Sequence, residues 1–250
     1  MDWDAGDEVA SHGGSSFDGI RLACDNIDQY NVLANFCRRD MVSEPHYVSP
    51  LRARQAAATR QLVITAAAEL FAAQGYGRTS LRQIAQSAGV AVETVRVQGR
   101  KRSLLAAAVR ILSFGRDVDE PVLVAPEADD LRAASNPDEF ALAAARLLTG
   151  LASRTVGVWR AFVSAAADDP EVDAELAQVQ ALIRSNLGSA VELLADRGWL
   201  RSDIEPDEIT VNLWLLVSTE NYDKLTGRLD WSVQRYEQWL ARALSDLLFR

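Results

Sequence analysis

The spacing of apolar residues is the feature that most limits the folds open to this chain. From about residue 50 onward, apolar side chains recur three and four positions apart, as on the buried face of a helix. No segment alternates apolar and polar residues for long, as a half-buried strand would. The sequence therefore predicts an all-α fold. Prolines at first turns and glycines after last turns divide it into about nine helices. The expected ranges are 50–74, 80–88, 92–98, 102–114, 137–153, 156–167, 170–197, 206–222 and 231–249.

Residues 1–48 differ from the rest of the chain because they are acidic and show neither period clearly. Such a segment is expected to be a disordered or weakly attached arm. A genuine extension with one short helix near residues 27–36 is the alternative, and Met41 offers a second start site. The acidic start at Met1–Asp4 is unlike a secretory signal, and no stretch is apolar enough to span a membrane. We therefore expect a cytoplasmic protein without a membrane partner.

The positions of cysteine and histidine exclude most catalytic chemistry. Cys24, Cys37, His12 and His46 all lie in the N-terminal segment, and residues 51–250 contain neither residue type. This part of the chain therefore lacks the Ser-His-Asp, Cys-His and His/Cys metal arrangements.

Carboxylates are what remains for an enzyme or a metal site. Asp168 and Asp169 are adjacent, but two neighbouring carboxylates before a proline are far short of a coordination sphere and are expected in a loop. We expect no catalytic residue, no metal site, no cofactor and no enzymatic activity. A carboxylate-dependent all-α enzyme is the distant alternative.

The charge is distributed unevenly along the chain, although its net value is −9. Residues 1–50 carry nine acidic and three basic residues, residues 51–105 carry two and nine, and residues 106–250 carry twenty-four and fourteen. The net charges are therefore −6, +7 and −10. One basic segment on an acidic body suits a DNA-binding module, because the remainder repels DNA. A solvated basic helix face is the alternative that charge alone leaves open.

Residues 56–105 have the pattern of a helix-turn-helix. Ser80 and Gln83 are spaced for a capping box at the start of one short helix, and Gly89 permits a tight turn before the next. Three pieces in order resemble the DNA-binding domain of the TetR family: residues 63–76 (VITAAAELFAAQGY), residues 79–90 (TSLRQIAQSAGV), and the set Glu93, Thr94, Val95, Lys101, Leu104 and Leu105.

This resemblance implies a homodimeric regulator with a helix-turn-helix domain in residues 49–105 and a helical regulatory and dimerisation domain in residues 106–250. The start of the second helix would touch phosphates, and the third would enter the major groove. The implied phosphate contacts are Thr79, Ser80, Arg96 and Lys101. The implied residues near bases are Arg82, Glu93, Thr94 and Gln98.

The chain departs from the family pattern around the third helix. Arg96 stands where most members have a phosphate-contacting tyrosine, and Ala91 replaces the usual Ser or Thr cap. The segment before Lys101 is one residue short and lacks the usual aromatic, so Val97 is expected to take that core position. Arginine contacts phosphate at least as well as tyrosine, which keeps the DNA-binding interpretation.

The helices expected at residues 206–222 and 231–249 are the predicted dimer interface. The first is apolar on all sides and the second has a wide apolar face, so both need extensive cover. The TetR family dimerises through a four-helix bundle of this kind, whereas packing into one monomer core is the alternative. The expected interface residues are Trp214, Tyr236, Leu240, Leu244 and Leu247.

A ligand pocket is expected among the helices that begin near residues 137, 156, 170 and 206. Aromatic side chains with isolated polar groups suit an apolar ligand, and the net charge of −10 favours a neutral or cationic one. Aromatics at helical spacing also fit a plain core. The expected pocket residues are Arg154, Trp159, Phe162, Asn186, Trp214, Ser218, Asn221 and Tyr222.

The predicted function is a sequence-specific DNA-binding transcriptional regulator, acting as a repressor that a small molecule releases from its operator. Its expected partners are a double-stranded DNA operator, a second copy of the chain and an unidentified small molecule. A helical small-molecule-binding protein of the same fold that has lost DNA binding is the alternative.

Overall fold

The computed structural model describes residues 50–117 and 121–249. Every regular element in these ranges is helical, which confirms the all-α prediction. The expected acidic arm at residues 1–48, its alternative helix at 27–36 and the Met41 start lie outside the described residues. The α-helices are α1 (Pro50–Gln74), α2 (Leu81–Ala88), α3 (Val92–Gln98), α4 (Lys101–Phe114), α5 (Asp129–Ala133), α6 (Pro137–Ala166), α7 (Pro170–Asp196), α8 (Pro206–Leu216), α9 (Thr219–Tyr222) and α10 (Val233–Phe249). Two 3-10 turns, Val122–Val124 and Pro126–Ala128, precede α5, and a π-helical segment, Asp223–Arg228, follows α9.

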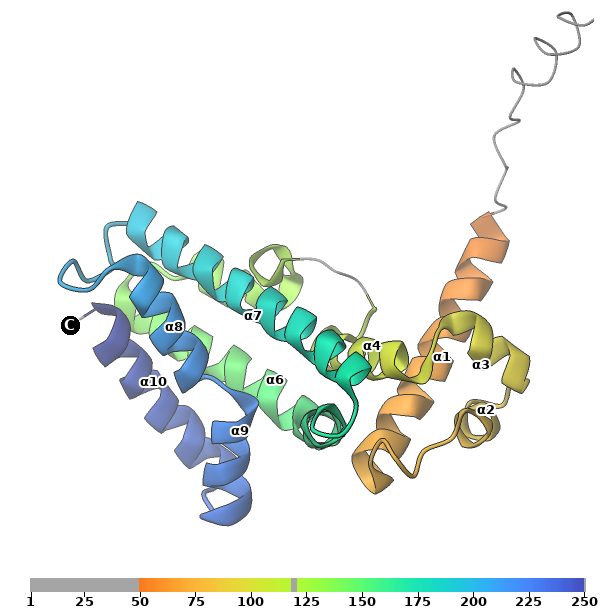
Figure 1. Ribbon diagram of the computed structural model, residues 1–250. Helices are drawn as coiled ribbons and strands as arrows, with labels where there is room; N and C mark the ends of the chain where they lie inside the picture. The colour runs from red at the N-terminus through yellow and green to blue at the C-terminus, as the bar shows by residue number, and fades with distance from the viewer. Residues whose placement is uncertain (1–49, 118–120, 250) are drawn as a thin grey trace, which may run out of the picture. The chain divides into compact units, whose positions relative to one another are not determined.

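Helices α1 to α4 pack around a shared core (Figure 1). Val63 and Phe71 of α1, Ile84 of α2 and Val95 of α3 are fully buried in it. Val63 and Phe71 lie eight positions apart, in keeping with the helical spacing of apolar residues in this part of the chain. Helix α2 and α3 are both short, so their position depends on these few buried side chains rather than on their own helical stability.

The turn between α2 and α3 forms as its sequence predicts. Ser80 and Gln83 make the reciprocal capping box at the start of α2, and Gly89 ends the helix at a φ of 67°. This left-handed conformation carries no steric penalty in glycine. Ala91 occupies the cap position of α3 without a side-chain hydrogen bond, so the first turn of α3 lacks the cap that Ser or Thr would supply.

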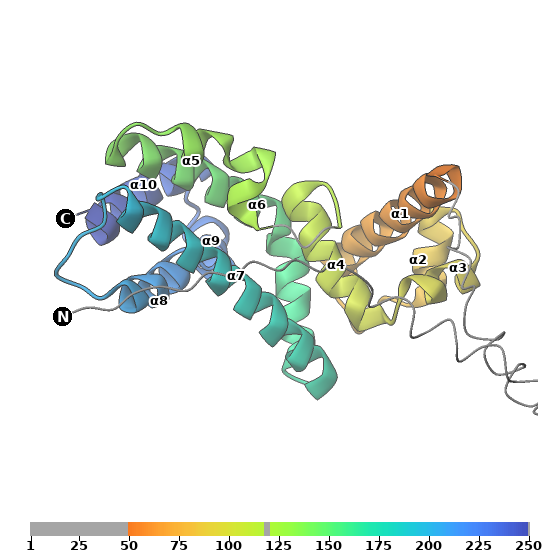
Figure 2. The same cartoon turned by 90° about the horizontal axis from the view of Figure 1, so that it is seen from above.

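Helices α6 and α7 join two clusters of buried side chains. Both contribute to the core around α1 and α4, and both also contribute to a second core with α8 and α10. Figure 2 shows α4, α6 and α7 lying between the α1–α3 helices and the α8–α10 helices. A shift of α6 or α7 would therefore alter the packing of both cores.

The helices expected at residues 137–153 and 156–167 are a single helix, α6. The polar residues Ser153, Arg154 and Thr155 do not interrupt this helix. The hydroxyl of Thr155 donates to the carbonyl of Leu151 within it. Gly157 also lies inside α6, where an added Cβ would meet the Cβ of Ala72 at 2.9 Å. This glycine permits the close approach of α1 and α6 and does not end a helix.

The helix expected at residues 206–222 ends early, at Leu216. The Asn221 amide donates to the carbonyls of Leu215 and Leu216, and the Ser218 hydroxyl accepts from the Asn221 backbone to cap α9. These local hydrogen bonds compete with helix continuation. The chain therefore turns at Val217, and this turn places residues 218–220 beside α6.

Candidate DNA-binding helices and candidate ligand cavity

Helix α3 carries four of the eight side chains that were expected to contact DNA. Val95 is its one fully buried residue, whereas Glu93 and Arg96 are exposed and Thr94 and Gln98 are half-buried. Arg96 pairs with Glu93 across 3.3 Å, one helical turn away. An exposed ion pair of this kind contributes little to stability, so both side chains can change conformation when another molecule binds to this face of α3.

Val97 corrects one expectation about α3. It was expected to fill a core position, but its side chain is 83% exposed. With Val95 fixed in the core, the helical rotation of 200° over two residues turns Val97 to the opposite side. An apolar side chain therefore stands on the outer face of α3 beside Arg96.

Thr79 and Lys101, which were expected to contact phosphates, make hydrogen bonds within the protein. Thr79 is buried, and its hydroxyl donates to the carbonyl of Gly75 at 2.8 Å. The Lys101 ammonium donates to the carbonyls of Tyr76 and Thr79 at 2.9 and 3.0 Å and lies 3.9 Å from the centre of the Tyr76 ring. Partial burial lowers the pKa of Lys101. Lys101 thus ties the start of α4 to the α1–α2 loop.

The remaining basic residues divide into paired and exposed groups. Arg102 pairs with Glu171 and Glu175 of α7, so it is held against the regulatory helices. Arg82 is exposed, as predicted for a residue that approaches DNA. Ser80 is also exposed, although its hydroxyl is occupied by the capping box. Arg52, Arg54 and Arg78 add exposed positive charge on α1 and in the α1–α2 loop.

A buried carboxylate connects α3 with the regulatory helices. The side chain of Asp117 is 9% exposed and accepts from Arg60 Nε of α1 and Arg110 Nε of α4, each at 2.7 Å. Arg60 also donates to the carbonyl of Gln98, the last residue of α3, at 2.9 Å. Sequence analysis did not predict this network, because Arg60 lies 57 positions before Asp117 in the chain.

The helices from α4 onward surround a cavity of about 390 Å³. Its walls come from α4 to α10 and the 3-10 turn Val122–Val124, and they consist mainly of leucine and other apolar side chains. Arg110 of the Asp117 network is part of its α4 wall. A volume of this size falls in the range of about 300–1,000 Å³ that small-molecule sites occupy.

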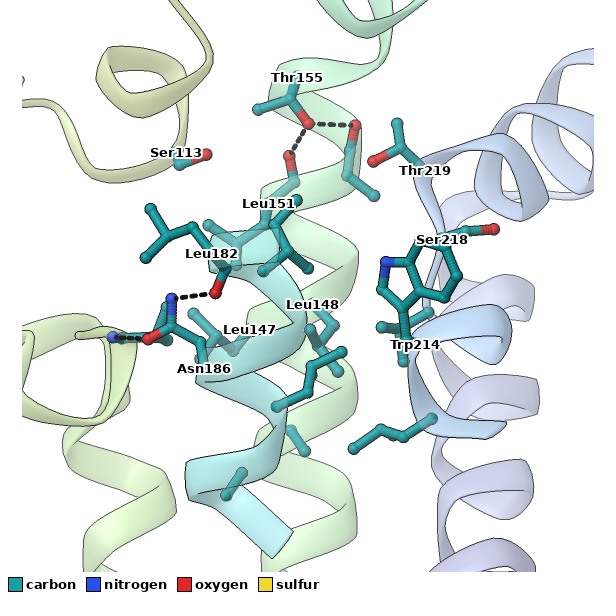
Figure 3. A pocket seen from close by; sticks show the side chains of 18 of the residues that line it. Ser113, Leu147, Leu148, Leu151, Thr155, Leu182, Asn186, Trp214, Ser218 and Thr219 are labelled. Carbon is teal, nitrogen blue, oxygen red and sulfur yellow. Dashed lines mark hydrogen bonds between the residues drawn. The ribbon is translucent and has the colours of Figure 1, made fainter. Parts of the chain in front are cut away.

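Four of the eight expected pocket residues line this cavity: Trp159, Asn186, Trp214 and Ser218. Figure 3 shows Trp214 and Ser218 on one side of it and Asn186 on the other. The Asn186 amide accepts from the backbone of Val122 and donates to the carbonyl of Leu182, so its polar groups are already used. Arg110, Thr219 and Glu220 also line the cavity but were not predicted from the sequence. Glu220 could have been found, because it is an acidic residue close to a largely apolar stretch.

The other four expected pocket residues have structural roles. Arg154 donates to the carbonyls of Leu112 and Ser113 at the end of α4, and Asn221 caps the end of α8. Phe162 is buried in the core around α1 and α4. Tyr222 packs edge-on against Tyr236 with ring centres 5.0 Å apart. These aromatics are core residues, as the alternative interpretation held.

Three of the expected interface residues are also buried within the subunit. Tyr236, Leu240 and Leu244 have relative exposures of 1%, 0% and 1%. They belong to the second core, in which α10 contacts α6 and α8. The centre of the wide apolar face of α10 therefore packs inside the subunit. Burial raises the pKa of the Tyr236 phenol to about 12. Leu247 is half-buried, and Trp214 lines the cavity.

Two absences hold for residues 50–117 and 121–249. No helix among them is both long and apolar enough to cross a membrane. No group of three or more His, Cys, Asp or Glu side chains in the same residues could hold a metal ion.

The sequence of the α1–α3 region is similar to a known family of proteins. Residues 63–95 match the family model of bacterial regulatory proteins, tetR family. This match spans the second half of α1, all of α2 and the first residues of α3. No curated protein sequence matches the chain.

Solved structures share the fold over most of the chain. A protein from Rhodococcus sp. described as a TetR-family transcriptional regulator aligns with a TM-score of 0.62 and 15% identity, over 76% of this chain and 98% of its own. A fatty acid degradation regulator from Bacillus halodurans gives 0.58 and 12%, over 74% and 94%. A protein from Saccharomonospora viridis described as a transcriptional regulator, in complex with choline, gives 0.58 and 19%, over 77% and 98%.

Proposed function

Because this chain carries a TetR-type DNA-binding domain within the fold of TetR-family regulators, we propose that it is a sequence-specific transcriptional repressor released from its operator by a small molecule. The observation that carries this proposal is the outer face of α3. Glu93, Arg96 and Val97 are exposed there and fill no core position, although α3 itself is anchored by Val95. Such a face on the second helix of a helix-turn-helix suits the major groove.

The contacts with DNA follow from which side chains are exposed. Arg82 and Arg96 supply positive charge for phosphates, and Ser80 marks the α2 N-terminus, whose backbone N–H groups favour phosphate. Thr94 and Gln98 lie on α3 within reach of base edges. Glutamine pairs with adenine, and an apolar side chain contacts the thymine methyl group.

Two subunits are needed for specific binding, and we place the dimer interface on the outer faces of α8 and α10. Val211 and Leu215 are 46% and 55% exposed, opposite the buried residues of α8. On α10, Trp239, Ala243 and Leu247 form a half-buried stripe four residues apart. These two helices contact one another, so the outer residues of both can contribute to one four-helix bundle.

Release from DNA would follow from the Asp117 network. A ligand in the cavity meets Arg110, which shares Asp117 with Arg60, and Arg60 holds the end of α3 through the Gln98 carbonyl. Displacement of α4 or Arg110 would therefore move α3. A dimer must keep its two recognition helices roughly 34–36 Å apart to enter successive major grooves. A ligand that favours another spacing by about 5 kcal/mol would release the DNA.

A neighbour in fold supports a small-molecule role for the cavity. The Saccharomonospora viridis protein was solved with choline, so this fold can hold a small organic molecule. The alternative function, a ligand-binding protein that has lost DNA binding, draws support from Lys101 and Arg102, whose charges are engaged within the protein.

A selection experiment distinguishes the two functions. Purified full-length protein is mixed with fragmented genomic DNA at low salt, and bound fragments are recovered and sequenced. The repressor proposal expects enrichment of a few fragments that share a two-fold symmetric motif with half-sites about one helical turn apart. Recovery of no DNA by a correctly folded protein would favour the ligand-binding alternative, and recovery of DNA without any shared motif would overturn sequence-specific binding.

A further inference from the structure

The cavity contains two ionisable side chains, Arg110 on α4 and Glu220 on α9. They differ in how their charges are balanced. Arg110 is paired with the carboxylate of Asp117 at 2.7 Å. The carboxylate of Glu220 accepts at 2.8 Å from the indole N–H of Trp159, which is a neutral donor. Within the described part of the chain, no ion pair involves Glu220.

Glu220 also lines a smaller hollow, which contains two arginines. Arg160 and Arg228 line it together with Asp223, Trp159 and Glu220 itself. Arg160 Nε donates to Asp223 at 2.9 Å, so its charge is already balanced. No ion pair joins Arg228 to Glu220 in the described part of the chain. The carboxylate therefore borders the larger cavity with a negative charge that no ion pair among the described residues offsets.

Aromatic rings and hydroxyls surround the same end of the larger cavity. Trp159 and Trp214 both line it, and Figure 3 shows Trp214 next to Ser218 and Thr219. Indole faces attract cations, most strongly where water is excluded. Leucines such as Leu147, Leu148 and Leu182 form the wall away from this end.

We propose that the cavity binds an amphiphilic ammonium cation, with its head group at Glu220 and Trp214 and its alkyl chain along the leucine wall. A carboxylate facing an apolar cavity is costly unless a cation accompanies it. An anionic head group would be repelled there, and a neutral one would leave the charge unbalanced. The regulatory consequence of this binding rests on the proposed function, whereas the binding itself does not.

The test uses three probes with the same chain length: decyltrimethylammonium, 1-decanol and decanoate. Each is titrated calorimetrically into the full-length protein, without DNA and below the concentration at which the probe forms micelles. We expect the cation to bind at least tenfold more tightly than the alcohol, and decanoate to bind most weakly. Equal affinities, or tightest binding of decanoate, would overturn the proposal, the latter because Arg110 would then be the recognising group.

Substitutions locate the head group. Glu220→Gln keeps an acceptor for Trp159 but removes the charge, so it should weaken cation binding about tenfold and leave 1-decanol unchanged. Trp214→Leu should weaken the cation several-fold with little effect on the alcohol. Glu192→Gln, at an exposed position of α7, is the matched control and should bind all three probes as wild type does. Retained cation affinity in Glu220→Gln would refute the placement.

The same titrations separate this inference from the proposed function. Unchanged 1-decanol affinity shows that the variant cavity is folded, so a loss of cation affinity then reports the charge alone. If the cation binds as expected but does not release DNA, the binding site stands and the proposed release fails. If the protein binds no DNA, the cation titration still decides the ligand class.

Discussion

At the scale of single residues, the direction of a side chain decides its role more than its charge does. Lys101 and Arg82 are both basic residues of the DNA-binding domain, and both were expected to approach DNA. The ammonium of Lys101 instead bonds two carbonyls within the domain, whereas Arg82 is exposed on α2. Sequence patterns predicted that both residues would contact DNA. They could not show that the Lys101 ammonium bonds carbonyl groups of the α1–α2 loop, because this contact depends on the distance between α4 and that loop.

Lys101→Ala should therefore act on stability. Loss of the two hydrogen bonds and the Tyr76 contact should lower the free energy of unfolding by about 1–3 kcal/mol. The salt dependence of DNA binding should stay as in wild type. Arg82→Ala, the matched control, should change stability by less than about 0.5 kcal/mol. Urea denaturation measures the free energy of unfolding of both variants. A stable Lys101→Ala protein with a weaker salt dependence would place the ammonium on DNA instead.

At the scale of helices, the elements of the DNA-binding domain were predicted well, and those of the regulatory domain less well. Capping residues and glycine turns are local signals, so α2 and the turn after it follow directly from Ser80, Gln83 and Gly89. The expected break between residues 153 and 156 is absent, because α6 continues through this stretch from Pro137 to Ala166. The early end of α8 is stabilised by hydrogen bonds from the Asn221 side-chain amide to the carbonyl groups of Leu215 and Leu216. The spacing of apolar residues does not reveal these hydrogen bonds.

The Asp117 network supplies a prediction about communication between helices. Asp117→Asn keeps the side-chain size but removes the charge that holds Arg60 and Arg110. We expect DNA affinity without ligand to fall several-fold, because Arg60 no longer fixes the Gln98 carbonyl at the end of α3. Release of DNA by a ligand should also weaken. Fluorescence anisotropy with labelled operator DNA measures both effects.

Glu127→Gln is the control for this substitution. Glu127 pairs with Arg116 at 3.1 Å, and this pair does not involve α3. It should leave DNA affinity and ligand response unchanged. Equal responses of Asp117→Asn and wild type to the same ligand would mean that the signal reaches α3 by another route.

At the scale of the whole molecule, the proposed dimer requires apolar surface that remains outside the subunit core. Val211→Glu should yield a monomer, because a charge at the centre of an apolar interface is costly, and obligate interfaces bury more than about 2,000 Å². Leu240→Glu should instead unfold the subunit, since Leu240 is fully buried. Leu229→Glu, at a residue that is 62% exposed, should remain dimeric. Sedimentation at micromolar concentration distinguishes these cases, and a dimeric Val211→Glu protein would contradict the α8 interface.

The central claim, that α3 and its surroundings bind operator DNA, is tested most directly by the salt dependence of binding. The logarithm of the association constant is measured against the logarithm of salt concentration for wild type, Arg96→Ala and Arg242→Ala, the last altering an exposed arginine of α10. Each phosphate contact contributes about −0.9 to the slope. We predict a steep negative slope for wild type, a slope shallower by about one per subunit for Arg96→Ala, and no change for Arg242→Ala. Absence of DNA binding at low salt, or a slope that Arg96→Ala leaves unaltered, would contradict the account.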